Sequence, residues 1–250
     1  MEGLLKVLTG AGIGPRRRMA SLVQQGRVAV NGEPASSFNQ PVDAGRDRIQ
    51  IDGRDIDAAR EKRVYLLLNK PAGILSTTRD ERGRPTVIDY LPEKLRHYKI
   101  YPVGRLDKES TGLVILTNDG QLAYRLTHPS FGYEKEYRVR LDRELLSADR
   151  LRIEQGVLLD DGITSPARVK DLSGQEEFVY GLVIHEGKKH IIRRMLARLG
   201  YRVMQLERTR LGGLLLGNLP AGKIRVLASS ELESLKKNTA ANQNGWYQDG

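Results

Sequence analysis

Apolar and polar residues alternate with two different periods at the start of the chain. Closely spaced leucines and valines predict a short helix with one apolar face near the N-terminus. Pro15 opens a second predicted helix over 16–25, because proline is tolerated in the first turn of a helix. The segments 27–35 and 47–54 alternate as strands around Asn-Gly and Asp-Gly turns. Residues 1–53 are therefore expected to form a compact module of helices and short strands.

From Arg63 onward the pattern mixes strands with helices. Strand-like runs are predicted at 64–70, 112–118, 136–141, 177–186 and 201–212. Two segments predict helices: 121–128, with Asp119 as its N-cap, and 188–199, which Gly200 ends. Many strands with few helices favour an α+β fold with a mixed, largely antiparallel sheet over regular βαβ alternation.

The chain divides into parts by composition. Its 250 residues are enough for one full domain plus a small one. After the module at 1–53, the polar residues 54–62 predict a linker. The second domain is expected over 63–235, and residues 236–250, which lack an apolar pattern, predict a mobile polar tail.

The chain is basic, with 41 Lys and Arg against 31 Asp and Glu, a formal charge of +10. A charge of this sign favours a polyanionic partner, either a nucleic acid or an anionic membrane face. The segment 185–210 alone holds eight Lys and Arg against two Glu, which favours phosphate contact over a merely solvated face. Arg16, Arg17 and Arg18 form a second cluster at a helix start, where the helix dipole disfavours cations, and so indicate an external anion.

Several classes of protein are disfavoured. The chain has no Cys, which excludes disulfides, thiol nucleophiles and thiolate zinc sites. No apolar run approaches the ~20 residues of a spanning helix, and no secretory signal is recognisable, so we expect a cytoplasmic protein. There is no nucleotide-binding glycine loop. The histidines of HEGKKH at 185–190 are five residues apart rather than four, which disfavours zinc, and Ser130 lacks the context of a hydrolase nucleophile.

Asp107 lies between Arg105 and Lys108, directly ahead of an apolar run. Its ordinary interpretations are a turn cap or a surface ion pair, which would contribute about 0–1 kcal/mol. The functional alternative is that the surrounding cations keep this carboxylate ionised and available as a nucleophile or base. Asp119, which precedes a helix pattern, is interpreted as structural.

The stretch VGRLDKESTGLVILTNDG at 103–120 resembles the signature of the RsuA/RluB group of ribosomal RNA pseudouridine synthases. Residues 1–53 resemble the small RNA-binding module called S4 that precedes the catalytic domain in this group. Further similarity is found at 68–92, 128–139, 185–195 and 210–227. Together these segments cover nearly the whole chain apart from the linker and the tail.

The resemblance implies isomerisation of specific uridines to pseudouridine in folded ribosomal RNA, without metal or cofactor. It assigns the catalytic aspartate to Asp107, the tyrosine beneath the base to Tyr137, and the arginine that pairs with the aspartate to Arg193. Arg105 would help to displace the target base, which must be flipped out of the RNA at a cost of a few kcal/mol. The remaining expected RNA-binding residues are Arg16, Arg17, Arg18, Lys188, Lys189 and Arg194.

One departure from the family pattern concerns the segment before the paired arginines. Lys189 and Ile191 stand where the family usually has Asn and Gln, so the polar contact that the Gln would make to RNA or to the sheet is not expected here, while the role of the following arginine is unaffected. The segments at 127–130 and 134–137 favour the large-subunit branch of the family, and a small-subunit enzyme is the alternative.

Two other classes remain open on the sequence. A non-catalytic RNA-binding or ribosome-assembly factor would share the charge and the S4-like module but would not need Asp107 or Tyr137. A membrane-surface protein would use the helix at 188–199, although this helix lacks Trp and Phe. We expect a monomer whose partner is ribosomal RNA or a pre-ribosomal particle, with no membrane contact.

Overall fold

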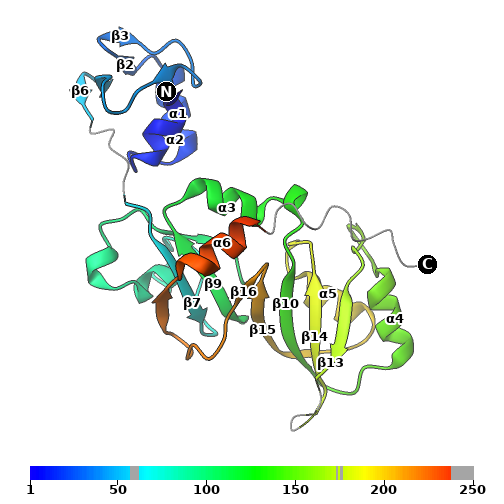
Figure 1. Ribbon diagram of the computed structural model, residues 1–250. Helices are drawn as coiled ribbons and strands as arrows, with labels where there is room; N and C mark the ends of the chain where they lie inside the picture. The colour runs from blue at the N-terminus through cyan, green and yellow to red at the C-terminus, as the bar shows by residue number, and fades with distance from the viewer. Residues whose placement is uncertain (57–61, 173, 175–176, 238–250) are drawn as a thin grey trace. The chain divides into compact units, whose positions relative to one another are not determined.

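The computed structural model describes residues 1–56, 62–172, 174 and 177–237, which form two compact units (Figure 1). The first unit contains Met1–Val64, Glu93–Lys99 and Asn118–Gly120. The second contains Tyr65–Pro92, Ile100–Thr117 and the chain from Gln121 onward. Each unit is described by itself.

The first unit is a small α/β module, as the alternating pattern predicted. Its elements are β1 (Glu2–Gly3), α1 (Leu4–Gly10), α2 (Arg16–Gln24), β2 (Val28–Val30), β3 (Glu33–Pro34), β4 (Pro41–Val42), β5 (Ile49–Ile51) and β6 (Arg54–Asp55). Strands β3, β2, β5 and β6 form one sheet in that order, and β1 pairs with β4. Both helices bury their apolar faces in one core, which includes Leu4, Leu8, Met19, Leu22, Val28 and Ile49.

Two tight turns set the register of this sheet. Asn31 and Gly32 both have positive φ, 55° and 90°, as a two-residue hairpin turn between right-twisted strands requires. Asp52 and Gly53 repeat this geometry between β5 and β6. Because β6 pairs with β5 through Arg54 and its neighbour, the sheet extends two residues into the segment expected to be a linker. Of that segment, residues 57–61 lie outside the described residues.

The second unit is built on a sheet with nine strands in the described residues. These strands are β7 (Tyr65–Lys70), β8 (Tyr101–Val103), β9 (Thr111–Thr117), β10 (Lys135–Leu141), β13 (Arg168–Asp171), β14 (Val179–Ile184), β15 (Val203–Leu211), β16 (Leu214–Leu215) and β17 (Ile224–Val226). The main order is β13-β14-β10-β15-β9-β7-β17, with β16 on β15 and β8 on β9. The α-helices are α3 (Gly120–Thr127), α4 (Ser147–Gln155), α5 (Ile191–Arg198) and α6 (Ser229–Lys237), and short elements are η1 (Val87–Tyr90), η3 (Pro129–Phe131), β11 (Leu158–Leu159) and β12 (Gly162–Ile163). The short element η2 (Glu93–Leu95) belongs to the first unit.

The two halves of this sheet meet at β9 and β15. These strands run parallel and pair only through Glu207 with Thr111 and Arg208 with Gly112. The other strand pairs of this sheet, over the described residues, are antiparallel. The prediction of an α+β fold with a mixed, largely antiparallel sheet is confirmed. Since β9 begins at Thr111 while β15 continues past it, the loop carrying Asp107 lies at this junction.

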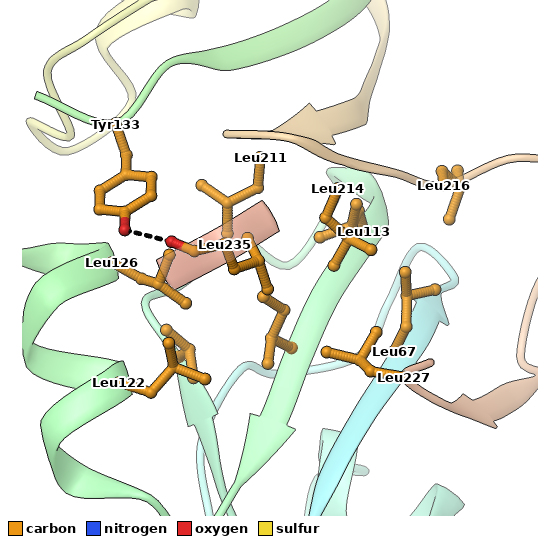
Figure 2. Packing of buried hydrophobic residues seen from close by; sticks show 12 residues of the cluster. Leu67, Leu113, Leu122, Leu126, Tyr133, Leu211, Leu214, Leu216, Leu227 and Leu235 are labelled. Atoms are coloured by element: carbon orange, nitrogen blue, oxygen red, sulfur yellow. Dashed lines mark hydrogen bonds between the residues drawn. The ribbon is translucent and has the colours of Figure 1, made fainter. Parts of the chain in front are cut away.

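Helices α3 and α6 cover β7 and β9 with one apolar core (Figure 2). Leu122 of α3 and Leu235 of α6 are buried with Leu113 of β9, and the hydroxyl of Tyr133 donates a hydrogen bond to the carbonyl oxygen of Leu235 at 2.5 Å. Helix α6 was not predicted, and it includes the first two residues of the segment expected to be a mobile tail. The rest of that segment, 238–250, lies outside the described residues.

Two predicted helices are present with shifted ends. Helix α3 begins directly after Asp119, whose carboxylate pairs with Arg63, while the N-cap role of Asp119 stays a prediction. Helix α5 begins at Ile191, three residues later than expected. The left-handed φ of 53° at His190 is incompatible with an α-helix, so residues 188–190 cannot form its first turn. None of the helices in the described part of the chain is long and apolar enough to cross a membrane.

Candidate active site

A buried lysine organises the loop that carries Asp107. Lys70, the last residue of β7, is fully buried. Its ammonium group donates hydrogen bonds to the carbonyl oxygens of Pro71 at 2.9 Å, Lys108 at 3.1 Å and Ser110 at 2.7 Å. Two of these carbonyls follow Asp107 in the chain, so Lys70 holds the backbone on the C-terminal side of the aspartate.

A serine holds the other side of the same loop. The hydroxyl of Ser76 donates to the carbonyl oxygen of Leu106 at 3.0 Å and accepts from the amide of Leu106 at 3.1 Å. The amide of Gly73 also donates to the carbonyl oxygen of Lys108 at 2.8 Å. The backbone on both sides of Asp107 is therefore held by two buried anchors from one segment.

The carboxylate of Asp107 contacts a histidine. Its Oδ1 lies 3.2 Å from Nε2 of His190, with side-chain exposures of 31% and 47%. Asp107 is thus neither buried nor directed into open solvent. His190, the residue before α5, has a left-handed backbone with a φ of 53°. Residues in sparsely populated backbone regions concentrate at functional sites.

Arg193 forms no ion pair with Asp107 among the contacts of the described residues, and its pairing with the aspartate stays a prediction. Arg193 instead donates to the carbonyl oxygen of Val203 at 3.1 Å. This arrangement follows from the helix start: α5 begins at Ile191, and its first turn carries Arg193 toward β15. Of the residues next to Asp107 in the chain, Arg105 is exposed and Lys108 lies 3.7 Å from Glu109.

Tyr137 lies in the middle of the sheet with a buried arginine beside it. Tyr137 of β10 is 8% exposed and is paired in register with Arg208 of β15, which in turn is paired with Gly112 of β9. Nε of Arg208 donates to the carbonyl oxygen of Leu113 at 2.8 Å, while its buried Nη2 has no hydrogen-bond partner in the described part of the chain. Burial and the nearby Arg208 lower the pKa of Lys135 to about 8, and Glu186 acts in the opposite direction.

A cavity of about 510 Å³ opens where β9 and β15 diverge. Asp107 and Tyr137 do not line it, but Glu109, which follows Asp107 closely, does. The charged and hydroxyl side chains that line it are Glu109, Thr111, Arg138, Arg140, Arg193 and Glu207. The structure therefore brings Glu109 of the Asp107 loop and Arg193 of α5 into the lining of one cavity, in which cations and carboxylates are mixed.

The remaining predicted RNA-binding residues fall into two groups. Arg194 forms a two-bonded ion pair with Asp161 at 2.8 and 3.1 Å, which lowers the pKa of Asp161, and Lys188 lies 3.3 Å from Glu186. Lys189 is exposed. The others are exposed in the first turn of α2, which has no acidic residue and no side-chain cap: Arg16, Arg17 and Arg18.

Sequence reasoning missed three residues of this site. Lys70 carried a signal, since a lysine that ends a buried strand rich in leucine is a candidate for a buried role. His190 carried none, because its left-handed backbone is not visible in a periodic pattern. Arg208 was counted only as one of many cations in the basic segment 185–210, and only the sheet register shows that it is buried beside Tyr137.

Replacing Lys70 with methionine is expected to lower the free energy of unfolding by about 3 kcal/mol at neutral pH, since three buried or partly buried carbonyls lose a donor. Burial lowers the pKa of Lys70 to about 8, with Glu109 and Asp107 opposing this shift, from an ordinary value of 10.5. Between these pKa values the unfolded chain binds more protons than the folded chain. The contribution of Lys70 to the free energy of unfolding therefore rises with pH.

Urea denaturation across this pH range measures the effect. The difference in the free energy of unfolding between the wild type and Lys70→Met should grow from about pH 8 to about pH 10. Lys94→Met, at an exposed position, is the control and should show a constant difference. A difference for Lys70→Met that stays flat or shrinks with pH would contradict this account.

Comparison with known proteins gives a consistent result over both units. Residues 64–198 match the family described as RNA pseudouridylate synthase, and residues 2–49 match the S4 domain. The chain is 37% identical over 243 residues to the ribosomal large subunit pseudouridine synthase B of Bacillus subtilis, covering 94% of this chain and 96% of the relative. It is 38% identical over 239 residues to an uncharacterized RNA pseudouridine synthase of Mycobacterium leprae, covering 94% and 92%.

A solved structure described as a pseudouridylate synthase superposes with a TM-score of 0.67 at 31% sequence identity, covering 94% of this chain and 100% of that one. The two family matches together include the helices and strands of the S4-like unit up to β5 and the loop that carries Asp107. The chain belongs to the RNA pseudouridylate synthase family and carries an N-terminal S4 domain.

Proposed function

We propose that this protein isomerises a specific uridine to pseudouridine in large-subunit ribosomal RNA, with Asp107 as its catalytic residue. The observation that carries the proposal is the anchored Asp107 loop, held by Lys70 and Ser76 at the edge of a cavity lined by arginines. The relative from Bacillus subtilis, which is named a large subunit pseudouridine synthase, supports the choice of RNA.

The reaction breaks the bond between N1 of uracil and C1′ of the ribose and forms one between C5 and C1′. C5 loses its proton and N1 gains one, so no atom is added or removed. A carboxylate in the position of Asp107 can act as a nucleophile or as a base in such a reaction. Because these atoms are inaccessible inside a helix, the nucleotide must be extruded, and a partly exposed carboxylate at a cavity edge can then meet it.

The other residues have supporting roles in this proposal. Arg193, which lines the cavity, would bind the nucleotide there. Tyr137, which lies beside Arg208 outside the cavity lining, is proposed to contact the extruded base because the family resemblance assigns this role to it. The three exposed arginines at the start of α2 would hold RNA through phosphates without reading its sequence: Arg16, Arg17 and Arg18.

Mapping pseudouridines in ribosomal RNA from cells with and without the gene tests the function. We expect one or a few positions of the large-subunit RNA to lose pseudouridine, and the purified protein to release tritium from large-subunit RNA labelled at uridine C5. A lost position in the small-subunit RNA would correct the substrate. An unchanged map together with no tritium release would contradict the enzyme and favour an assembly factor.

Replacing His190 with glycine separates the role of its side chain from that of its backbone. Glycine tolerates the φ of 53° at this position, so the fold should not be destabilised. Loss of the contact with Asp107 should lower kcat about fivefold, because a half-exposed pair contributes about 1 kcal/mol. The affinity for RNA should change little. Lys189→Gln, at the adjacent exposed position, is the control and should instead weaken RNA binding. If kcat is equal for His190→Gly and the wild type, His190 does not position Asp107.

A further inference from the structure

A strip of cations crosses the sheet beside the cavity and has no role in the chemistry described above. It consists of Arg138 and Arg140 on β10 and Lys170 on β13, and is called the basic strip here. Arg138 is paired in register with Gly181 of β14, and Gly181 with Lys170. Cross-strand partners present their side chains on the same face, so Arg138 and Lys170 share one face of the sheet.

The alternation along β10 places both arginines on that face. Arg138 and Arg140 are exposed, while the alternate residues Tyr137, Val139 and Leu141 are buried on the other face. Residues two apart on a strand are about 6.8 Å apart. This separation is close to that of successive phosphates in an extended RNA strand, so two neighbouring phosphates can each meet one guanidinium group.

Other arginines of the same sheet are used differently. Arg210 is paired with Glu136 at 2.8 Å and with Glu134 at 3.1 Å, and Arg168 is also paired with Glu134. These residues form a closed network of ion pairs. Arg140, by contrast, forms no ion pair or side-chain hydrogen bond with any residue that the structure describes, although it lines the cavity. Its charge is therefore available to an external anion.

The acidic residues give the strip a direction. Glu207 of β15 is the register partner of Arg138 on the side away from β14, and it lines the cavity with Glu109. These carboxylates disfavour a phosphate on the β15 side of the cavity, but they can accept hydrogen bonds from ribose hydroxyls. A nucleoside therefore fits the cavity, and the phosphates that follow it fit the side toward β14 and Lys170.

We propose that the basic strip binds consecutive phosphates of an unpaired RNA segment next to the nucleotide in the cavity, and so positions the substrate. The inference rests on the proposed function in that the bound RNA is the substrate of the Asp107 site. The ligand chemistry is a single-stranded phosphodiester, held through charge and spacing rather than through base identity.

The double variant Arg138→Gln/Arg140→Gln tests the strip. Binding to a single-stranded oligouridylate is measured by fluorescence anisotropy over a range of salt concentrations. Loss of two phosphate contacts should make the slope of log K against log salt shallower by about 1.4 and reduce affinity roughly 25-fold at about 0.1 M salt. In tritium release from ribosomal RNA, the loss should fall mainly on KM.

The matched control is Arg150→Gln/Arg152→Gln on α4, which removes the same charge from residues that do not line the cavity. It should retain the wild-type slope and KM. Circular dichroism shows whether the double variant folds. If it does not, Lys170→Gln, at an exposed position on β13, replaces it and should make the slope shallower by about 0.7.

The outcomes separate this inference from the proposed function. Equal slopes and equal KM values for the strip variants and the control would overturn the strip even if the wild type forms pseudouridine. A shallower slope for the strip variants in a protein that releases no tritium would support the strip as an RNA-binding surface and refute the enzyme. A shallower slope in both the strip variants and the control would overturn a localised strip in favour of diffuse charge.

Discussion

Replacing Asp107 with asparagine is expected to reduce the rate of pseudouridine formation by roughly 10⁴-fold or more, equivalent to about 5.5 kcal/mol of activation free energy. The substitution keeps the shape of the side chain but removes the charge that a nucleophile or base needs. The loop should keep its conformation, because Lys70 and Ser76 hold its backbone rather than the carboxylate. RNA affinity should therefore remain within about twofold of the wild type.

Tritium release from ribosomal RNA labelled at uridine C5 measures this loss, and anisotropy measures the affinity. Glu144→Gln makes the same chemical change at an exposed position away from the cavity and should retain full activity. Turnover by Asp107→Asn within tenfold of the wild type would refute the assigned role. A large loss of RNA affinity would instead mean that the carboxylate organises the site rather than performing the chemistry.

Replacing Gly112 with alanine should destabilise the protein by about 3 kcal/mol or more. A Cβ at this position would lie 2.4 Å from the carbonyl oxygen and 2.7 Å from the amide nitrogen of Arg208, and the φ of 99° is itself strained for alanine. Both atoms belong to backbone, so no side-chain movement relieves the overlap. Because β9 and β15 pair through only two residue pairs, the substitution would separate the two halves of the sheet at the candidate site.

The urea midpoint and the activity should therefore fall together for Gly112→Ala. Gly187→Ala is the control, since a Cβ there meets no atom within 4 Å and the residue is exposed. We expect its free energy of unfolding to stay within about 0.5 kcal/mol of the wild type. If Gly112→Ala is as stable as the wild type, β9 and β15 can move apart without a free-energy cost, and their pairing does not maintain the candidate site.

The parts of the candidate site that could be predicted are those that local sequence reveals, and the parts that could not depend on contacts between distant segments. Asp107 could be singled out from its neighbours in the chain, and Tyr137 and Arg193 from the motifs that carry the family resemblance. The partner of Asp107 could not, because His190 is distant from it in the chain and also has a left-handed backbone, which no sequence pattern marked. Periodicity records which faces are apolar, and a single residue of unusual φ leaves no mark on it.

The sequence by itself determined the central strands, the helices of the S4 domain, the α+β class and the basic character of the segment 185–210, since each depends on local periodicity or on composition. The tertiary structure alone decided the strand order that brings β9 beside β15, the burial of Lys70 beneath the Asp107 loop, and the packing of α6 onto β9. These features depend on contacts between segments distant in sequence. Their free energy comes from burial and hydrogen bonds that no local pattern encodes.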